Sequence, residues 1–186
     1  MKFCSECAAP LREMIPEGDN RPRYVCSACD TIHYQNPRVV TGCLVTAGRQ
    51  VLLCRRAIEP RLGYWTIPAG FMENGETMRE GALRETWEEA AAEVEDVALY
   101  RLFDIPHINQ VYVFFRGELA GGYGIGPESL EVRLFDEQDI PWSELAFPIV
   151  TDVLTDYFSD RQGDEYPVRV SKPSPLWAKQ TQHKRS

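Results

Sequence analysis

Short runs of hydrophobic residues, many of them alternating with polar residues, cover most of this chain and predict β-strands. Strands are predicted at residues 39–47, 50–57, 64–68, 96–104, 109–119 and 130–137, and a helix at residues 147–159. A second helix is predicted from about residue 78 to residue 91, because Thr77 and Glu80 form the pattern of a capping box. This order of elements predicts an α/β (α+β) fold in which a mixed sheet is packed between helices.

The helix after Thr77 is expected to be amphipathic. At 100° per residue, one side carries an apolar stripe of Leu83, Trp87, Ala90 and Val94. The other side carries Glu85, Glu88 and Glu89, which are expected to share one exposed patch. Neighbouring carboxylates repel each other by roughly a few tenths of a kcal/mol per pair, and hard divalent cations such as Mg2+ prefer carboxylate oxygens. Any solvated amphipathic helix also shows acids opposite an apolar stripe, so the helix alone leaves a metal site and a solvated surface both open.

The segment from Gly70 to Ala92 resembles the Nudix box, in which a glycine, four glutamates and an arginine stand at fixed spacing. The matching residues are Gly70, Glu76, Arg84, Glu85, Glu88 and Glu89. Thr86 replaces the usual bulky aliphatic residue, and Ala91 with Ala92 replaces the final glycine and aliphatic residue. Ala91 is expected either to extend the helix or to cost about 1–2 kcal/mol of local strain. The resemblance spans roughly residues 37–166 and implies the same mixed sheet between helices.

The resemblance also implies roles for these side chains in metal-dependent cleavage of a diphosphate. Glu85 and Glu89 would be the principal ligands of Mg2+, or of Mn2+ in its place, with the backbone carbonyl of Ala69 nearby. Glu88 would share the metal or handle a proton. Arg84, like Glu76, would mainly organise the catalytic site.

A further carboxylate is predicted beyond the helix. The segment that begins at Glu128 resembles the part of zinc-ribbon NADH pyrophosphatases that adds a carboxylate to the site. Glu128 is the first choice for this extra metal ligand or general base and Glu131 the second, although a loop acid that merely solvates a strand end fits the pattern too. The glycine-rich loop at residues 120–127 looks mobile and is a candidate for substrate contact.

Two Cys-x-x-Cys pairs near the start of the chain predict a small separate module. Cys4 and Cys7 are followed after eighteen residues by Cys26 and Cys29, a spacing typical of a structural zinc site with four thiolate ligands. Residues 1–36 are therefore predicted to form a zinc ribbon, and two disulfides, a redox pair or an iron site remain the alternatives. The other two cysteines, at positions 43 and 54, lie in apolar runs and are expected to be buried small hydrophobic residues.

Recognition of the group attached to the diphosphate is expected to fall to flanking loops and strands. Phe103, His107 and Gln110 combine rings and an amide that suit stacking on a base and hydrogen bonding to it. His107 fits a structural role equally well. Arg55 and Arg56 are placed to approach phosphates, but exposed arginines are often simply solvated.

Composition and charge restrict the class of protein further. With 186 residues, 44% of them hydrophobic, the chain suits one ordinary domain plus a small module. A net charge of -8 argues against broad nucleic-acid binding and would repel a phosphate-bearing substrate unless cations are bound. No run approaches about 18 consecutive apolar residues, so a cytoplasmic protein without membrane insertion is expected. Residues 167–186 are predicted to be a partly disordered tail, with Trp177 as a possible anchor.

The function predicted from these features is Mg2+-dependent hydrolysis of a nucleoside diphosphate linked to another group, with release of AMP. ADP-ribose and FAD are the favoured substrates, because the Ser-Gln-Pro-Trp-Pro-Phe-Pro signature of NADH pyrophosphatases is replaced by Pro106 to Gln110. The alternative is a non-catalytic Nudix module that senses a nucleotide or serves as an interaction module, although all three helix acids are present. Resemblance to ADP-ribose pyrophosphatases implies a homodimer.

Overall fold

The structure is a computed structural model that describes residues 1–174, and its chain divides into two compact units, Met1–Pro37 and Arg38–Ser186. The predicted boundary at residue 166, between the Nudix domain and a C-terminal tail, is not tested by this division and stays a prediction. In residues 1–174, no helix is both long and apolar enough to span a membrane. Trp177 lies outside the described residues.

The first unit is a three-stranded antiparallel sheet with very little core. Its strands, in the spatial order β1-β2-β3, are β1 (Leu11–Met14), β2 (Arg23–Cys26) and β3 (Ile32–His33). Among residues 1–37, all of which the structure describes, only Cys4, Pro16 and Cys26 are buried. A unit that buries so little apolar surface needs another source of stability, such as a metal ion.

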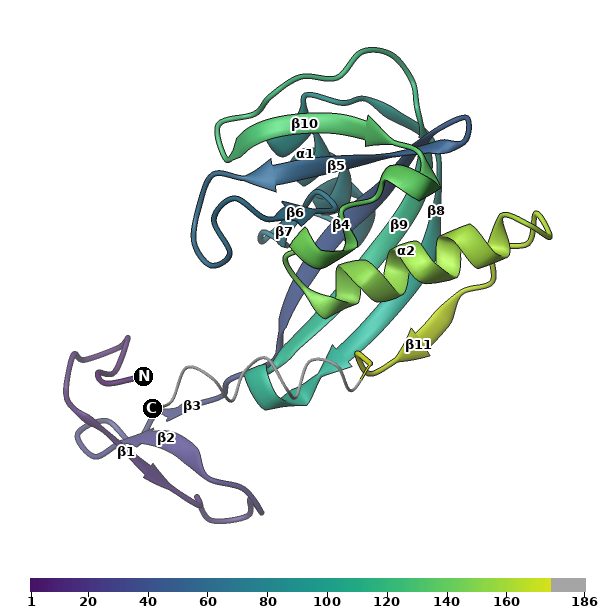
Figure 1. The fold of residues 1–186 in the computed structure, drawn as a ribbon. Coiled ribbons are helices and arrows are strands. Elements are labelled where there is room, and N and C mark those ends of the chain that lie inside the picture. Colours follow the sequence, from purple (N-terminus) through teal and green to yellow (C-terminus); the bar gives the residue numbers. More distant parts are fainter. Residues whose placement is uncertain (175–186) are drawn as a thin grey trace. The chain divides into compact units, whose positions relative to one another are not determined.

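The second unit is built on a mixed eight-stranded sheet whose strands run in the order β10-β5-β4-β9-β8-β11, with β6 beside β5 and β7 beside β4 (Figure 1). The β4–β9 and β8–β11 pairs are parallel and the others antiparallel. The strands are β4 (Arg38–Ala47), β5 (Gln50–Arg56), β6 (Trp65–Thr66), β7 (Ala69–Phe71), β8 (Val94–Ile105), β9 (Gln110–Leu119), β10 (Ser129–Phe135) and β11 (Arg169–Ser171).

One helix covers each face of this sheet, α1 (Met78–Ala90) and α2 (Pro148–Asp160), as Figure 1 shows. Alternate residues of β5 show why two cores form. Leu53 packs in the cluster that includes α2, whereas Leu52 and Cys54 pack in the cluster that includes α1. The predicted mixed sheet between helices is thereby confirmed.

Several short elements were not predicted from the sequence. They are β7, β11 and three 3-10 helices, η1 (Pro106–Ile108), η2 (Glu137–Asp139) and η3 (Trp142–Glu144). The strand β11 falls inside the predicted tail and pairs in parallel with β8. Arg169 in this strand also holds both carboxylate oxygens of Asp160 at the end of α2, with distances of 2.5 and 2.6 Å.

Candidate active site

The loop before α1 and the helix itself are tied together by Arg84. Its guanidinium donates two hydrogen bonds to Glu76, at 3.0 and 2.9 Å, and one each to Glu85 and Glu88, both at 2.9 Å. It also donates to the carbonyl of Phe71 at 3.1 Å. This guanidinium holds the pKa of Glu76 near 2, well below the ordinary value of a glutamate. Arg84 therefore holds three carboxylates in place, those of Glu76, Glu85 and Glu88.

Two glycines allow close approach between this helix and the strands beside it. A Cβ atom on Gly70 would lie 2.2 Å from the carboxylate of Glu85, so a larger residue there would displace that carboxylate. A Cβ atom on Gly81 would lie 2.7 Å from an oxygen of Glu76 and 2.8 Å from Oγ1 of Thr41. The glycine of the Nudix-like segment thus leaves room for one of the segment's own carboxylates.

The three helix acids do not share one exposed patch, and that expectation was wrong. Glu89 is only 5% exposed, and the backbone N–H of Ala69 donates to its Oε2 at 3.3 Å. Burial, with a smaller contribution from the charge of Glu85, raises the pKa of Glu89 to about 8. Burial also raises the pKa of Glu85, whereas the side chain of Glu88 is half exposed.

The apolar stripe predicted for α1 matches its buried face only at Ala90. Trp87 is 55% exposed, although it was expected to pack inward. The helix packs on the sheet through small side chains, because these let its backbone come close to β4. The buried residues of α1 are Gly81, Ala82, Thr86, Glu89 and Ala90. Thr86 fits this face because its hydroxyl donates to the carbonyl of Ala82 at 2.7 Å.

The end of α1 is closed by Ala91 and by the glycine-rich loop. Ala91 adopts the left-handed conformation, with φ of 44° and ψ of 36°, so the strained alternative is the one observed. The N–H groups of Gly124 and Gly126 donate to the carbonyls of Ala90 and Glu89 at 2.7 and 3.1 Å. These bonds hold the loop at the helix end, which differs from the mobile loop that its composition suggested.

Of the two candidate carboxylates after this loop, the structure brings only Glu128 toward the helix acids. The charge of Glu128 contributes to raising the pKa of both Glu85 and Glu89, behind burial as the main cause. Glu131 instead pairs with Arg55 at 3.8 Å and with a second arginine on its own strand at 3.7 Å.

The two arginines at the end of β5, Arg55 and Arg56, also differ in how they lie relative to the helix acids. Arg56 lies close enough to Glu89 for its positive charge to oppose the rise in the pKa of that buried carboxyl. Its Nε donates to the carbonyl of Pro60 at 2.8 Å. Arg55 donates to the carbonyl of Gly63 at 2.9 Å and pairs with Glu131. Of the two arginines, Arg56 is therefore the one whose charge acts on the pKa of the buried Glu89.

Phe103 has no surface available for a ligand, which corrects its assignment as a substrate-binding ring. Its side chain is fully buried in the core below α2, 6.3 Å from the ring of Phe114. The reason is that its side chain lies on the face of β8 that packs in the core cluster with α2. His107 is exposed in η1, and Gln110 is half-buried at the first position of β9.

The sequence reasoning missed Arg38 and Phe71, whose side chains lie against each other. Arg38 pairs with Gln110 in the sheet, and its guanidinium lies 4.7 Å above the ring of Phe71. The pKa of Tyr112 is raised by burial, against which the positive charges of Arg56 and Arg38 act. An arginine that opens a strand and an aromatic residue just after the Nudix-like glycine were the available signals.

The four cysteines of the first unit gather around one point. All four Sγ atoms lie within 4.8 Å of one another, and the structure has no disulfide among residues 1–174. Close pairs are 3.4 to 3.7 Å apart, which suits a tetrahedron of thiolates whose edges are roughly 3.8 Å for zinc–sulfur bonds of about 2.3 Å. Cys43 and Cys54 are buried as predicted, and burial raises the pKa of Cys43 to about 12.

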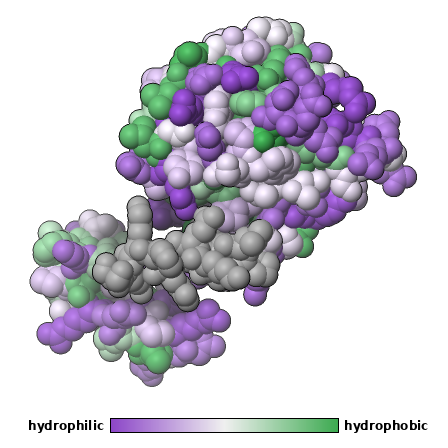
Figure 2. Space-filling view, viewed as in Figure 1, coloured by the Kyte–Doolittle hydropathy of each residue, from purple (hydrophilic) through white to green (hydrophobic). Residues whose placement is uncertain are grey.

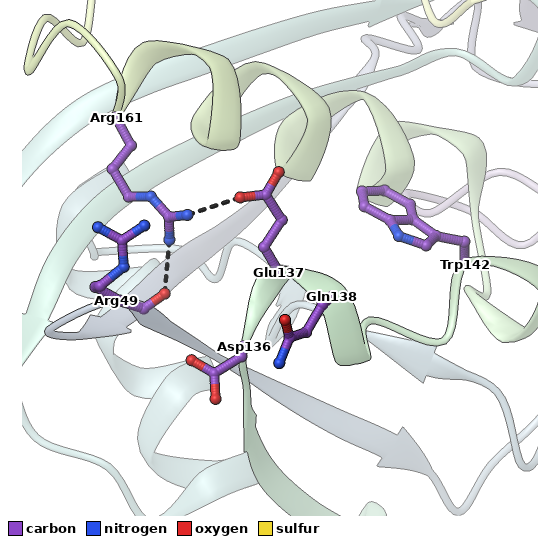
Figure 3. Close-up of a pocket in the computed structure, with 6 residues that line it drawn as sticks. All are labelled: Arg49, Asp136, Glu137, Gln138, Trp142 and Arg161. Atoms are coloured by element: carbon purple, nitrogen blue, oxygen red, sulfur yellow. Dashed lines mark hydrogen bonds and ion pairs between the residues drawn. The ribbon is translucent and has the colours of Figure 1, made fainter.

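A separate hollow of about 490 Å³ lies at the opposite end of β5, about 20 Å along the strand from Arg56 (Figure 3). None of the predicted site residues lines it. Its lining residues are Arg49, Asp136, Glu137, Gln138, Trp142 and Arg161. Arg161 is held there by Glu137 at 2.7 Å and by the carbonyl of Arg49 at 2.6 Å. Figure 2 shows that the surface around the end of α2 is mainly hydrophilic.

The fold and this arrangement of acids agree with the family to which the sequence matches. Residues 36–154 match the NUDIX domain family, and residues 2–35 match the zinc-ribbon family described as Nudix N-terminal. The chain belongs to the Nudix hydrolase family.

The names of two relatives bear on the substrate. The chain is 32% identical to NAD-capped RNA hydrolase NudC of Chromobacterium violaceum, over 77% of this chain and 50% of that protein. The NudC of Pseudomonas putida strain W619 is 31% identical over 90% of this chain and 59% of its own length. The chain thus spans about half to three fifths of the length of these curated relatives.

Solved structures show the same fold. A NUDIX hydrolase from Nitrosomonas europaea is 50% identical with a TM-score of 0.89, and the match covers 92% of this chain and 98% of that one. An ADP-ribose pyrophosphatase from Streptococcus suis shares the fold at 19% identity and a TM-score of 0.62, over 73% of this chain and 99% of that chain.

Proposed function

We propose that this chain is a Mg2+-dependent pyrophosphatase that cleaves the diphosphate of a nucleoside diphosphate linked to another group and releases a nucleoside monophosphate. The observation that carries this proposal is the buried Glu89 beside Glu85, two carboxylates whose pKa values are raised by burial. Withdrawing acids from water is unfavourable unless a cation compensates their charge.

The donor set fits a hard divalent cation. Glu85 and Glu89 would hold Mg2+, or Mn2+ in its place, with the Ala69 carbonyl, Glu88 and Glu128 as further oxygen ligands. When bound, the metal supplies positive charge that polarises the phosphoryl oxygens and lowers the pKa of a bound water. We likewise assign a structural Zn2+ to the four thiolates of the first unit.

The protein's own residues complete the site. Arg84 keeps Glu76, Glu85 and Glu88 in place through its hydrogen bonds, so these carboxylates need little reorganisation when substrate binds. Glu128 is the preferred acceptor for the proton of the attacking water, because it is exposed and its charge reaches Glu85 and the buried acid. Glu88 is the second choice.

Recognition of the substrate is assigned to the strand ends beside the acids. Arg56 would bind a phosphate, and the exposed ring of Phe71 under Arg38 would stack on a planar base. On β4, Arg38 pairs with Gln110, and Thr41 pairs with Gly70 of β7. These two positions are three residues apart, which is about 10 Å. That spacing suits a base and a diphosphate of one ligand, with His107 and Gln110 at its outer end.

ADP-ribose and FAD remain the favoured substrates, since the segment from Pro106 to Gln110 differs from the signature of NADH pyrophosphatases. A NAD-capped RNA is the second candidate, because this is what the names of the relatives at 31–32% identity specify. The net charge of -8 disfavours a long RNA as the main ligand.

The test is release of AMP from ADP-ribose, FAD, NADH and a NAD-capped oligoribonucleotide with Mg2+, comparing the unchanged chain with Glu89→Gln. The matched control is Glu93→Gln, an exposed acid just beyond the helix. We expect Glu89→Gln to lower kcat by about 10²-fold or more and the control to leave it unchanged. No turnover of any compound, with nucleotide binding retained, would support the non-catalytic sensor instead.

The assignment of Arg56 has its own matched pair. Arg56→Gln is expected to raise KM by about 10-fold, because it removes a charged contact to phosphate. Arg55→Gln should leave KM nearly unchanged, because Arg55 is engaged with Gly63 and Glu131. Equal effects of the two substitutions would contradict this assignment.

A further inference from the structure

We propose that His33 is a positioning residue of the zinc ribbon, whose ring N–H donates a hydrogen bond to the Cys4 thiolate and slows loss of the metal. This inference rests on the zinc site proposed above and assigns it a partner outside the four sulfurs. Nε2 of His33 lies 3.3 Å from Sγ of Cys4.

The backbone already supplies one donor to each sulfur. Each cysteine accepts an N–H from the residue two positions further along the chain, a pattern that follows from the tight turn of each Cys-x-x-Cys pair. The donors are Glu6 to Cys4, Ala9 to Cys7, Ala28 to Cys26 and Thr31 to Cys29. These contacts are common to all four sulfurs and do not distinguish one from another.

The contact from His33 is different because it comes from another strand. His33 lies in β3, 29 residues beyond Cys4, and its position is fixed by pairing with Tyr24 of β2. It is a second donor to a sulfur that is only 4% exposed. The hydroxyl of Thr31, 3.2 Å from Sγ of Cys29, is the comparable contact on an exposed sulfur.

Burial decides which of these two side-chain donors matters more. Water can replace the Thr31 hydroxyl at the exposed Cys29, but little water can reach Cys4 if His33 is lost. Four thiolates around one Zn2+ carry a net charge of -2, and a donor reduces the charge concentrated on a sulfur that solvent does not screen. Since the unit has almost no core, a weaker metal site also weakens its fold.

The experiment is the rate of zinc transfer from the full zinc-loaded chain to a chromogenic chelator. His33→Leu is expected to speed release by about 10-fold, the low end of what loss of such a partner costs. His33→Gln keeps an N–H at similar reach and should release zinc nearly as slowly as the unchanged chain. Thr31→Val should have a smaller effect, and Met14→Gln, an exposed change on β1, none.

A Co2+-substituted chain gives a second readout, since the sulfur-to-metal charge-transfer band should shift with His33→Leu and not with Met14→Gln. Release from His33→Leu at the rate of the unchanged chain overturns the proposal. So does equally fast release from His33→Gln, because the effect would then come from ring packing rather than from the donor. If His33→Leu binds no zinc, the rate of zinc release from His33→Gln decides. A rate close to that of the unchanged chain supports the proposal, and a much faster rate overturns it. If the unchanged chain binds no zinc at all, both this proposal and the zinc site are overturned. None of these zinc measurements bears on the proposed nucleotide hydrolysis.

Discussion

The burial of Glu89 predicts that the free energy of unfolding of the Mg2+-free protein depends on pH in a direction unusual for an acid. Burial raises the pKa of this carboxyl from the ordinary value of 4.5 to about 8 in the folded chain. Between these two values the folded state binds more protons than the unfolded state. The free energy of unfolding therefore falls as pH rises from about 5 to about 8.

The size of the effect follows from the two pKa values. At pH 7.5 this carboxyl is ionised in the unfolded chain but protonated in the folded chain. Because pH 7.5 is three units above its ordinary pKa of 4.5, keeping it protonated costs about 4 kcal/mol of stability. Glu89→Gln removes this cost, and a buried amide N–H without a partner offsets about half of it. We expect the variant to be about 2 kcal/mol more stable at pH 7.5, which is about 4–8 °C in Tm.

The measurement is urea and thermal unfolding of the zinc-loaded, Mg2+-free chain from pH 5 to pH 8.5, with and without the substitution. Strong chelators are avoided because they would also remove zinc. At pH 5 the variant should be about 1 kcal/mol less stable than the unchanged chain, because its unpaired amide costs the same at every pH; the two curves should cross near pH 6, above which the variant is the more stable. Saturating Mg2+ should then stabilise the unchanged chain by about 3 kcal/mol and the variant much less. Parallel pH profiles, or equal stabilisation by Mg2+, would refute the reasoning.

Two further substitutions test the closure of α1 by the free energy of unfolding in urea. Ala91→Gly should add about 1 kcal/mol because Ala91 has a φ of 44°, whereas Ala92→Gly should lose stability as a buried methyl is removed; a loss at both positions would contradict the strain. Gly126→Ala should cost more than about 2 kcal/mol, since its Cβ would lie 1.8 Å from the carbonyl oxygen of Glu88. Gly121→Ala, with nothing within 4 Å of the added atom, should change little, and similar costs at both glycines would count against the contact.

The main elements were predictable because their hydrophobic patterns and caps are local. The capping box of Thr77 and Glu80 is present with both of its hydrogen bonds, at 3.2 and 2.7 Å. Strands β7 and β11 were not predictable in this way. Each has three residues and is defined by backbone pairing with β4 or β8, which leaves too few positions for a periodic pattern.

The buried face of α1 was mispredicted for a different reason. The hydrophobic pattern treats charged residues as exposed and large apolar residues as buried, but Glu89 is buried and Trp87 is exposed. The helix lies close to the sheet through small residues, and tight packing of such residues gives only a weak hydrophobic signal. Phe103 shows the reverse error, since a ring near the end of a predicted strand was expected to meet a ligand but is fully buried in the core beside α2. The acids were identified by their spacing, but their surroundings were not.

Those surroundings indicate where positive charge is needed. Arg84 donates hydrogen bonds to Glu76, Glu85 and Glu88, so part of the negative charge at the site is compensated without a bound ion. The buried Glu89 receives no hydrogen bond from this guanidinium and instead accepts one from the Ala69 N–H on β7. The uncompensated negative charge is therefore on the side that faces β7, where glycine at position 70 leaves the carboxylates accessible to each other. A divalent cation bound there would complete the charge balance that Arg84 provides only in part.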